Sequence, residues 1–166
     1  MKTIYFIRHA KSSWAQPDLR DFDRPLNKRG LRDAPFMAEK MKSFGMQPNA
    51  ILTSPANRAR TTAGYFAETY GITGNAWIED KDLYHAYSDT ILEVVRAQSN
   101  EWQTLLVFGH NPGFTSLANQ FRGGKNIDNV PTCGIFKIES EAAQWVDLKT
   151  KNSRLTEFHY PKQYFS

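Results

Sequence analysis

The sequence contains short, almost continuously apolar runs, each followed by a stretch with helical spacing. This alternation restricts the possible folds more than any other feature. The runs are 2–7, 50–53 and 104–108. Such runs are typical of parallel β-strands that are covered on both faces. Because strands alternate with helices along the chain, the pattern indicates an α/β fold. We therefore expect a three-layer sandwich in which a mostly parallel central sheet is flanked by helices.

Capping and helix-breaking residues mark the remaining elements. Asn27 can cap a helix over 28–44 that stops at Gly45, although Pro35 allows a later start near Asp33. Other expected elements are a helix from Ser54-Pro55 to 70, a weak strand over 76–79, a helix over 88–98, a helix from Asn111-Pro112, and an antiparallel hairpin of 134–138 and 144–148. The C-terminal stretch "KNSRLTEFHYPKQYF" matches no motif; we expect it to pack on the domain, with a partner-binding strand as the alternative.

Length and composition favour one ordinary domain over residues 1–166, with no repeat or linker-like segment. No apolar run is long enough to span a bilayer, and the first apolar residues run directly into Arg8-His9, which leaves no room for a signal-peptide core. We expect a cytoplasmic protein without membrane association. Cys133 is the only cysteine, so it is interpreted as a small apolar residue in a strand.

The net charge of +4 is mild, and acidic residues are spread among the basic ones, as in "DLRDFDRPLNKRGLRD". A nucleic-acid-binding face needs basic residues gathered together. We therefore expect no nucleic acid partner and only a weak attraction for anions.

Polar residues follow three of the expected strands at the point where each strand ends. They are Arg8-His9, the segment from Ser54 to Arg58, and the segment from Gly109 to Pro112. The carboxyl ends of parallel strands share one edge of the sheet, where ligands bind. Arg8, His9, Arg58 and His110 can therefore converge, beside two helix starts that favour an anion.

Two arginines and two histidines at one edge describe a site for a phosphate-like group. Arginine donates two parallel hydrogen bonds to an oxyanion, a neutral imidazole is a nucleophile, and a protonated one is a donor. Taken singly, each residue has a structural interpretation: a salt-bridged arginine, a hydrogen-bonded histidine, or part of a solvated helix face. Their shared position at strand ends favours the site.

Three motifs carry a resemblance to a known family. "FIRHAKSSW", "LTSPANRARTTA" and "VFGHNPG" resemble the histidine phosphatase superfamily, with its Arg-His-Gly, Ser-Pro-x-x-Arg-Ala and Gly-His-Asn motifs. "DFDRPLNKRG" further resembles the small phosphohistidine phosphatase (SixA-like) branch. The resemblance covers the chain to about Gly113 and implies a phosphoglycerate mutase-like fold.

The resemblance also implies roles for the converging residues. His9 would take the phosphoryl group, Arg8, Arg58 and His110 would hold its oxygens together with Asn111, and water would discharge the intermediate. No metal or cofactor is implied, and Asp18, Asp21 and Asp23 are interpreted as turn residues. Arg24 either borders the pocket or forms a salt bridge within its loop.

The chain departs from the superfamily pattern at two places. Ala10 stands where glycine is usual, which costs some backbone freedom. Many members place a glutamate proton donor after the third strand, but here that region is "IEDKDLYHAYSD". His85 is the favoured candidate, and Asp82 and Glu79 remain open, as does a packing role for "LYHA".

The missing glutamate bears on the substrate. Cleaving an alcohol ester requires a well-placed general acid, whereas phosphohistidine releases imidazole, a better leaving group. We expect a metal-independent phosphohydrolase that acts on a phosphorylated protein, such as a histidine phosphotransfer domain. The alternatives are a phosphomonoesterase for small metabolite or sugar phosphates, and a non-catalytic phosphate-binding module, although the presence of all four pocket residues counts against the latter.

Overall fold

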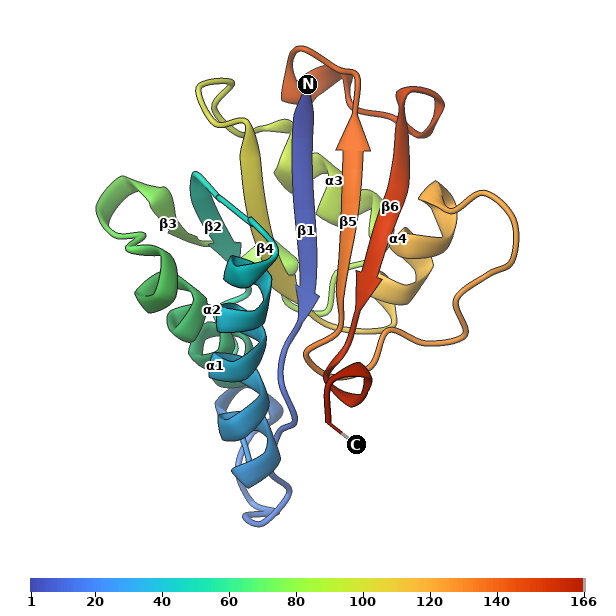
Figure 1. Ribbon diagram of the computed structural model, residues 1–166. Coiled ribbons are helices and arrows are strands. Elements are labelled where there is room, and N and C mark those ends of the chain that lie inside the picture. Colours follow the sequence, from blue (N-terminus) through green and yellow to red (C-terminus); the bar gives the residue numbers. More distant parts are fainter. Residues whose placement is uncertain (166) are drawn as a thin grey trace.

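The computed structural model describes residues 1–165, which fold around one six-stranded sheet with the strand order β3-β2-β4-β1-β5-β6 (Figure 1). The first four strands in chain order run parallel, and β5 pairs antiparallel with both β1 and β6. Their bounds are β1 Lys2–Arg8, β2 Ala50–Thr53, β3 Trp77–Glu79, β4 Thr104–Gly109, β5 Ile135–Ser140 and β6 Ser153–His159.

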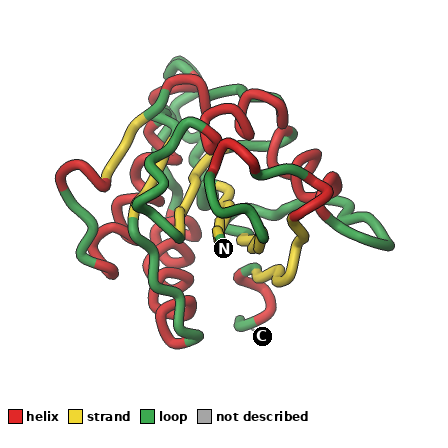
Figure 2. The backbone as a smooth tube through the Cα atoms, turned by 90° about the horizontal axis from the view of Figure 1, so that it is seen from above, coloured by secondary structure: helices red, strands yellow, loops and turns green. Residues whose placement is uncertain are grey.

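Helices cover both faces of this sheet (Figures 1 and 2). One face carries α1 (Lys28–Ser43) and α2 (Asn57–Tyr70), and the other carries α3 (Ser88–Arg96) and α4 (Gly113–Phe121). The three-layer α/β sandwich expected from the sequence is confirmed. Among the described residues, no helix combines the length and the apolar character that crossing a membrane requires.

The continuous apolar run of β1 is explained by burial on both sides. Ile4 and Phe6 lie in the core beneath α3 and α4, whereas Tyr5 and Ile7 lie in the core beneath α1 and α2. Successive side chains of a strand point to opposite faces, so both sets must be apolar.

Strand register brings the polar residues that follow the strands to one level. Arg8 lies opposite Gly109 of β4, and Thr53 lies opposite Phe108. The residues that directly follow β1, β2 and β4 are His9, Ser54 and His110. The parallel strands end at the lower edge of the sheet in Figure 1, so the register puts these three residues at that edge.

The starts of three helices differ from or refine the prediction. Asn27 caps α1 as expected, since its side chain accepts from the Gly30 N–H at 2.9 Å. The later start near Asp33 was wrong, because the helix runs through Pro35. The other two predicted starts came too early: α2 begins at Asn57 and α4 at Gly113.

The predicted strand over 144–148 was wrong. Its core, Trp145–Asp147, is a single 3-10 turn, in which Trp145 and Leu148 are buried while Val146 is 62% exposed. Two apolar residues three positions apart fit such a turn, and the Trp145 indole donates to the carbonyl of Trp102 at 2.9 Å. The partner of β5 is instead β6, within the C-terminal stretch that matched no motif.

Candidate active site

A cavity of about 220 Å³ opens at the edge where β1, β2 and β4 end. Its lining contains most of the residues singled out in the sequence: Arg8, His9, Arg24, Arg58, His85, His110 and Asn111. Asp82 and Glu79, the other candidates for a proton donor, are not part of it. The predicted convergence of two arginines and two histidines is therefore present in the fold.

His9 is buried, with 6% of its surface exposed, and its ring is fixed by the backbone. Its Nδ1 lies 2.8 Å from the carbonyl oxygen of Ala10. Because a carbonyl only accepts, Nδ1 carries the proton and Nε2 keeps its lone pair. Burial lowers the pKa of His9 to about 3, and the charges of Arg58 and Arg8 act in the same direction. The imidazole is therefore neutral near pH 7.

A hydrogen bond from the backbone of Ala10 to a side chain of α2 fixes the chain after His9. The Ala10 N–H donates to the Thr62 hydroxyl at 3.0 Å, and that hydroxyl donates to the carbonyl of Arg58 at 2.7 Å. Within the described chain, the only non-glycine residues with positive φ are His85 and Cys133. Position 10 does not need the conformational freedom of glycine, so alanine fits there.

His110 lies beside His9, with the two ring centroids 5.2 Å apart. Its Nε2 is 2.8 Å from the Ser54 hydroxyl, which itself accepts from the Ala56 N–H at 3.3 Å. Ser54 can thus donate its proton to Nε2, which leaves the proton of the neutral ring on Nδ1. Nδ1 is buried and has no hydrogen-bond partner among the described residues. Burial, followed by His9 and Arg58, places the pKa of His110 well below its ordinary value.

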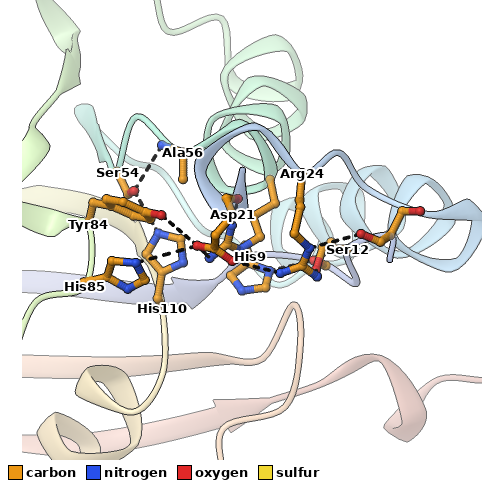
Figure 3. A network of polar contacts seen from close by, with 12 residues as sticks. His9, Ser12, Asp21, Arg24, Ser54, Ala56, Tyr84, His85 and His110 are labelled. Carbon is orange, nitrogen blue, oxygen red and sulfur yellow. Dashed lines mark hydrogen bonds and ion pairs between the residues drawn. The ribbon is translucent and has the colours of Figure 1, made fainter. Parts of the chain in front are cut away.

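Asp21 stands at the centre of the polar network in Figure 3. Its Oδ2 accepts from Arg58 at 3.0 Å and from the Tyr84 hydroxyl at 2.7 Å, and its Oδ1 accepts from Arg24 at 3.1 Å. Arg58 also donates to the Asp21 carbonyl at 2.7 Å. The interpretation of Asp21 as a turn residue missed this role; its place three residues before Arg24 was the available signal.

The charges of this network reinforce one another. Burial raises the pKa of Asp21, but the hydrogen bonds from Tyr84 and Arg58 outweigh it and hold that pKa well below its usual range. Burial and the bond to Asp21 raise the pKa of Tyr84 to about 12. Asp21 is therefore ionised near pH 7 and Tyr84 is a donor.

Arg8 approaches the pocket from β1. One guanidinium nitrogen donates to the Val130 carbonyl at 3.0 Å, while the buried Nε has no partner in the described part of the chain. Burial, and then the charge of Arg58, lower the pKa of Arg8. Arg8 and Arg58 line the same pocket, and of these two cations only Arg58 is paired with a carboxylate. The pair therefore favours the binding of an anion.

Asn111 and Arg24 hold parts of the pocket wall. The Asn111 amide donates to the Val130 carbonyl at 2.9 Å and accepts from the Thr115 N–H, so it ties the start of α4 to the segment that holds Arg8. Arg24 fulfils both interpretations: it lines the pocket and pairs with Asp21.

His85 lies at the mouth of the pocket, where 64% of its side chain is exposed. Its Nε2 is 3.7 Å from Asp21 Oδ2, and its ring lies 3.9 Å from that of Tyr84 (Figure 3). No group of three or more His, Cys, Asp or Glu side chains in residues 1–165 is placed to hold a metal ion.

Comparison with known proteins places this geometry in a family. The pattern of the histidine phosphatase superfamily (branch 1) matches residues 4–87. The chain belongs to the histidine phosphatase superfamily. An uncharacterized protein of Mycobacterium tuberculosis, Rv1276c, is 32% identical over 94% of this chain and 100% of its own length.

Solved structures agree with this placement. A protein of Agrobacterium tumefaciens assigned as the phosphohistidine phosphatase SixA is 30% identical, with a TM-score of 0.81 over 96% of this chain and 98% of that one. The protein histidine phosphatase SixA in complex with tungstate shares the fold, with a TM-score of 0.80 at 18% identity over 97% and 98% of the two chains. The chain is a phosphatase of the SixA-like branch.

Proposed function

We propose that this phosphatase hydrolyses phosphohistidine on a protein, through a phosphoryl group carried on His9 and without a metal ion. The observation that carries the proposal is the state of His9. Its Nδ1–H is held by the Ala10 carbonyl, which leaves the Nε2 lone pair of a neutral ring in a pocket with three arginines. A neutral, oriented imidazole is the form that attacks phosphorus.

The reaction has two displacements. Nε2 of His9 attacks the phosphorus atom, and the bond from phosphorus to the substrate ring breaks; that ring is protonated on its other nitrogen, so it takes the electron pair and leaves as neutral imidazole. Water then attacks phospho-His9, the phosphorus–nitrogen bond breaks with its electron pair returning to Nε2, and the protons of the water stay on the inorganic phosphate that is released. Arg8 and Arg58 bind the charged oxygens in both steps, and the Nδ1–H of His110 is the donor for a further oxygen.

The choice of substrate follows from what lines the pocket. Its described lining contains no carboxylic acid. Asp21 lies next to it, but it is ionised and already accepts from Arg58, Arg24 and Tyr84, so it has no proton to donate. An alcohol leaving group needs such a proton, whereas the imidazole of phosphohistidine is a better leaving group. His85 is the remaining candidate for a donor.

The proposal extends to the setting of the reaction. The substrate is a histidine phosphotransfer domain, met in the cytoplasm, and residues 1–166 act as one histidine phosphatase domain. The last point is supported by the single sheet that joins all six strands of the described residues.

Relative rates on two substrate classes test the proposal. Phosphate release is measured, with a chelator present, from a phosphohistidine peptide and from a panel of sugar phosphates. Because the described lining offers no carboxylic acid to protonate an alcohol, kcat/KM for the esters should lie about 100-fold or more below that for phosphohistidine. In His85→Gln the phosphohistidine rate should be retained. Equal rates on both classes would instead identify an esterase for small metabolites, and activity lost with the chelator would identify a metal enzyme.

A further inference from the structure

A second and larger cavity, of about 660 Å³, adjoins the phosphate pocket. The two cavities share Arg8, Lys11 and Thr132, so a ligand seated at His9 can extend from one into the other. The larger one, called the groove below, is bounded by the start of α1, by the segment 122–132, and by residues 158–165 after and at the end of β6. These last residues lie on the side of the sheet where β1 and β6 end (Figure 1).

The groove concentrates positive charge on one part of the protein. Six cations line it against two carboxylates, an excess as large as the net charge of +4 of the whole chain. The cations are Arg8, Lys11, Arg29, Arg32, Arg122 and Lys162. One carboxylate, Asp33, is buried and pairs with Arg32 at 2.8 Å and with Arg29 at 3.7 Å. The even mixture of charges along the sequence did not predict this concentration.

The groove has the composition of a protein interface. The side chains of Arg29 and Arg32 are 48% and 54% exposed, and Lys162 is exposed as well, so the charges stand at an accessible rim. Phe158 and Tyr160 add aromatic surface to the lining. Arginine and aromatic residues are enriched at protein interfaces, whereas a small-molecule site encloses its few polar contacts.

An exposed aromatic residue flanks the phosphate pocket but not the groove. Trp14 is 71% exposed, and the guanidinium of Arg24 lies 3.3 Å from the centre of its ring. A partner that reaches His9 can therefore contact both an exposed aromatic side chain and the cations of the groove. A protein surface is large enough to make both contacts at once.

We propose that the groove docks an acidic segment of the phosphoprotein substrate, beside the phosphohistidine that enters the phosphate pocket. That the substrate carries phosphohistidine rests on the proposed function. That the docked segment is acidic rests on the positive charge of the groove. Each contact between an exposed cation and a carboxylate contributes little to the binding free energy. Several such contacts together nevertheless select the partner and increase the rate at which it associates.

Two synthetic phosphohistidine peptides test the docking, one with four glutamates on one side of the histidine and one with glutamines there. The acidic peptide should have a kcat/KM about 10-fold higher at low salt. Arg29→Gln and Lys162→Gln should each lower this preference by about two- to five-fold. Lys151→Gln, at the opposite edge of the sheet, is the matched control and should not change it.

Binding of the unphosphorylated, fluorescently labelled acidic peptide separates docking from catalysis. Docking predicts that it binds the wild type and Lys151→Gln more tightly than Arg29→Gln or Lys162→Gln, even if no phosphohistidine substrate is turned over. The same affinity for all four proteins would overturn the proposal, as would equal kcat/KM for the two peptides. Displacement of the peptide by a nucleoside diphosphate at lower concentration than by the unlabelled peptide would also overturn it, in favour of a small-molecule subsite.

Discussion

Replacing Asp21 with asparagine should loosen Arg58 and Arg24 together, because the two guanidiniums share its carboxylate. That carboxylate accepts from Tyr84 at 2.7 Å, from Arg58 at 3.0 Å and from Arg24 at 3.1 Å. The side chains of Arg58 and Arg24 are only 6% and 8% exposed, so each would remain a buried cation with a weaker partner. The change tests whether Asp21 organises the pocket.

The size of the effect follows from these contacts. A hydrogen bond to a charged group contributes about 1.5–3 kcal/mol. Asp21 is 40% exposed, which screens its pairs, and asparagine keeps one acceptor oxygen. We expect the free energy of unfolding to fall by about 2–3 kcal/mol and the Tm by about 5–10 °C. Because Arg58 is then less well oriented, kcat/KM for phosphohistidine should fall by about 10- to 100-fold.

Asp23→Asn is the matched control for Asp21→Asn. Asp23 pairs with Arg20 at 2.8 Å, but both side chains are exposed, at 42% and 78%. Such a pair contributes less than about 1 kcal/mol, so stability and activity should hardly change. Urea unfolding and phosphate release are measured on both variants. Equal behaviour of the two would refute the claim that Asp21 orders the arginines.

Two further predictions concern stability. The unfolded chain takes up protons at His9 and His110 below about pH 6.5, whereas the folded chain does not, because their pKa values are lowered in the folded protein. Each histidine should therefore lower the free energy of unfolding by about 2 kcal/mol as the pH falls from about 6.5 to about 5. Urea unfolding of His9→Asn should show about half of the wild-type loss, and an equal loss would contradict the lowered pKa of His9. A Cβ on Gly30 would lie 2.2 Å from the Lys11 carbonyl oxygen, so Gly30→Ala should destabilise the protein by about 1–3 kcal/mol. Gly64→Ala, in open space on α2, should instead stabilise it by up to about 1 kcal/mol, and the same sign for both would contradict the close approach at Gly30.

Strong local signals explain which parts of the fold could be predicted from the sequence. The runs 2–7, 50–53 and 104–108 became β1, β2 and β4, because each is buried on both faces of the sheet. Asn27 and Gly45 marked the start and the end of α1, the first through its side-chain cap and the second through its positive φ. The segment 144–148 failed because a short apolar run does not distinguish a strand from a turn that buries residues three positions apart.

The site residues that follow strand ends could be predicted from the sequence, whereas the contacts made from loops could not. The register of a parallel sheet brings His9 and His110 together. Asp21 belongs to a long loop, and no periodicity in the sequence shows that its carboxylate turns back to Arg58. Ser54 was expected to cap α2, yet its hydroxyl meets His110. Contacts of this kind depend on the path of the loop in space.

The groove illustrates the same limit for charge. Its cations come from residues 8 and 11, from the start of α1, from residue 122 and from residue 162, so no local run of basic residues indicates them. The net charge of +4 is a sum over the whole chain and does not show where these cations lie. Only the fold shows that they stand along one path that leads to His9.

Trapping the phosphoenzyme tests whether His9 carries the phosphoryl group. The wild type and His9→Asn are mixed with a phosphohistidine peptide carrying radioactive phosphate, with a chelator present, and quenched within one turnover. We expect an acid-labile, alkali-stable label on the wild-type protein that maps to His9, and neither label nor phosphate release in His9→Asn. Phosphate release by His9→Asn at the wild-type rate would contradict it.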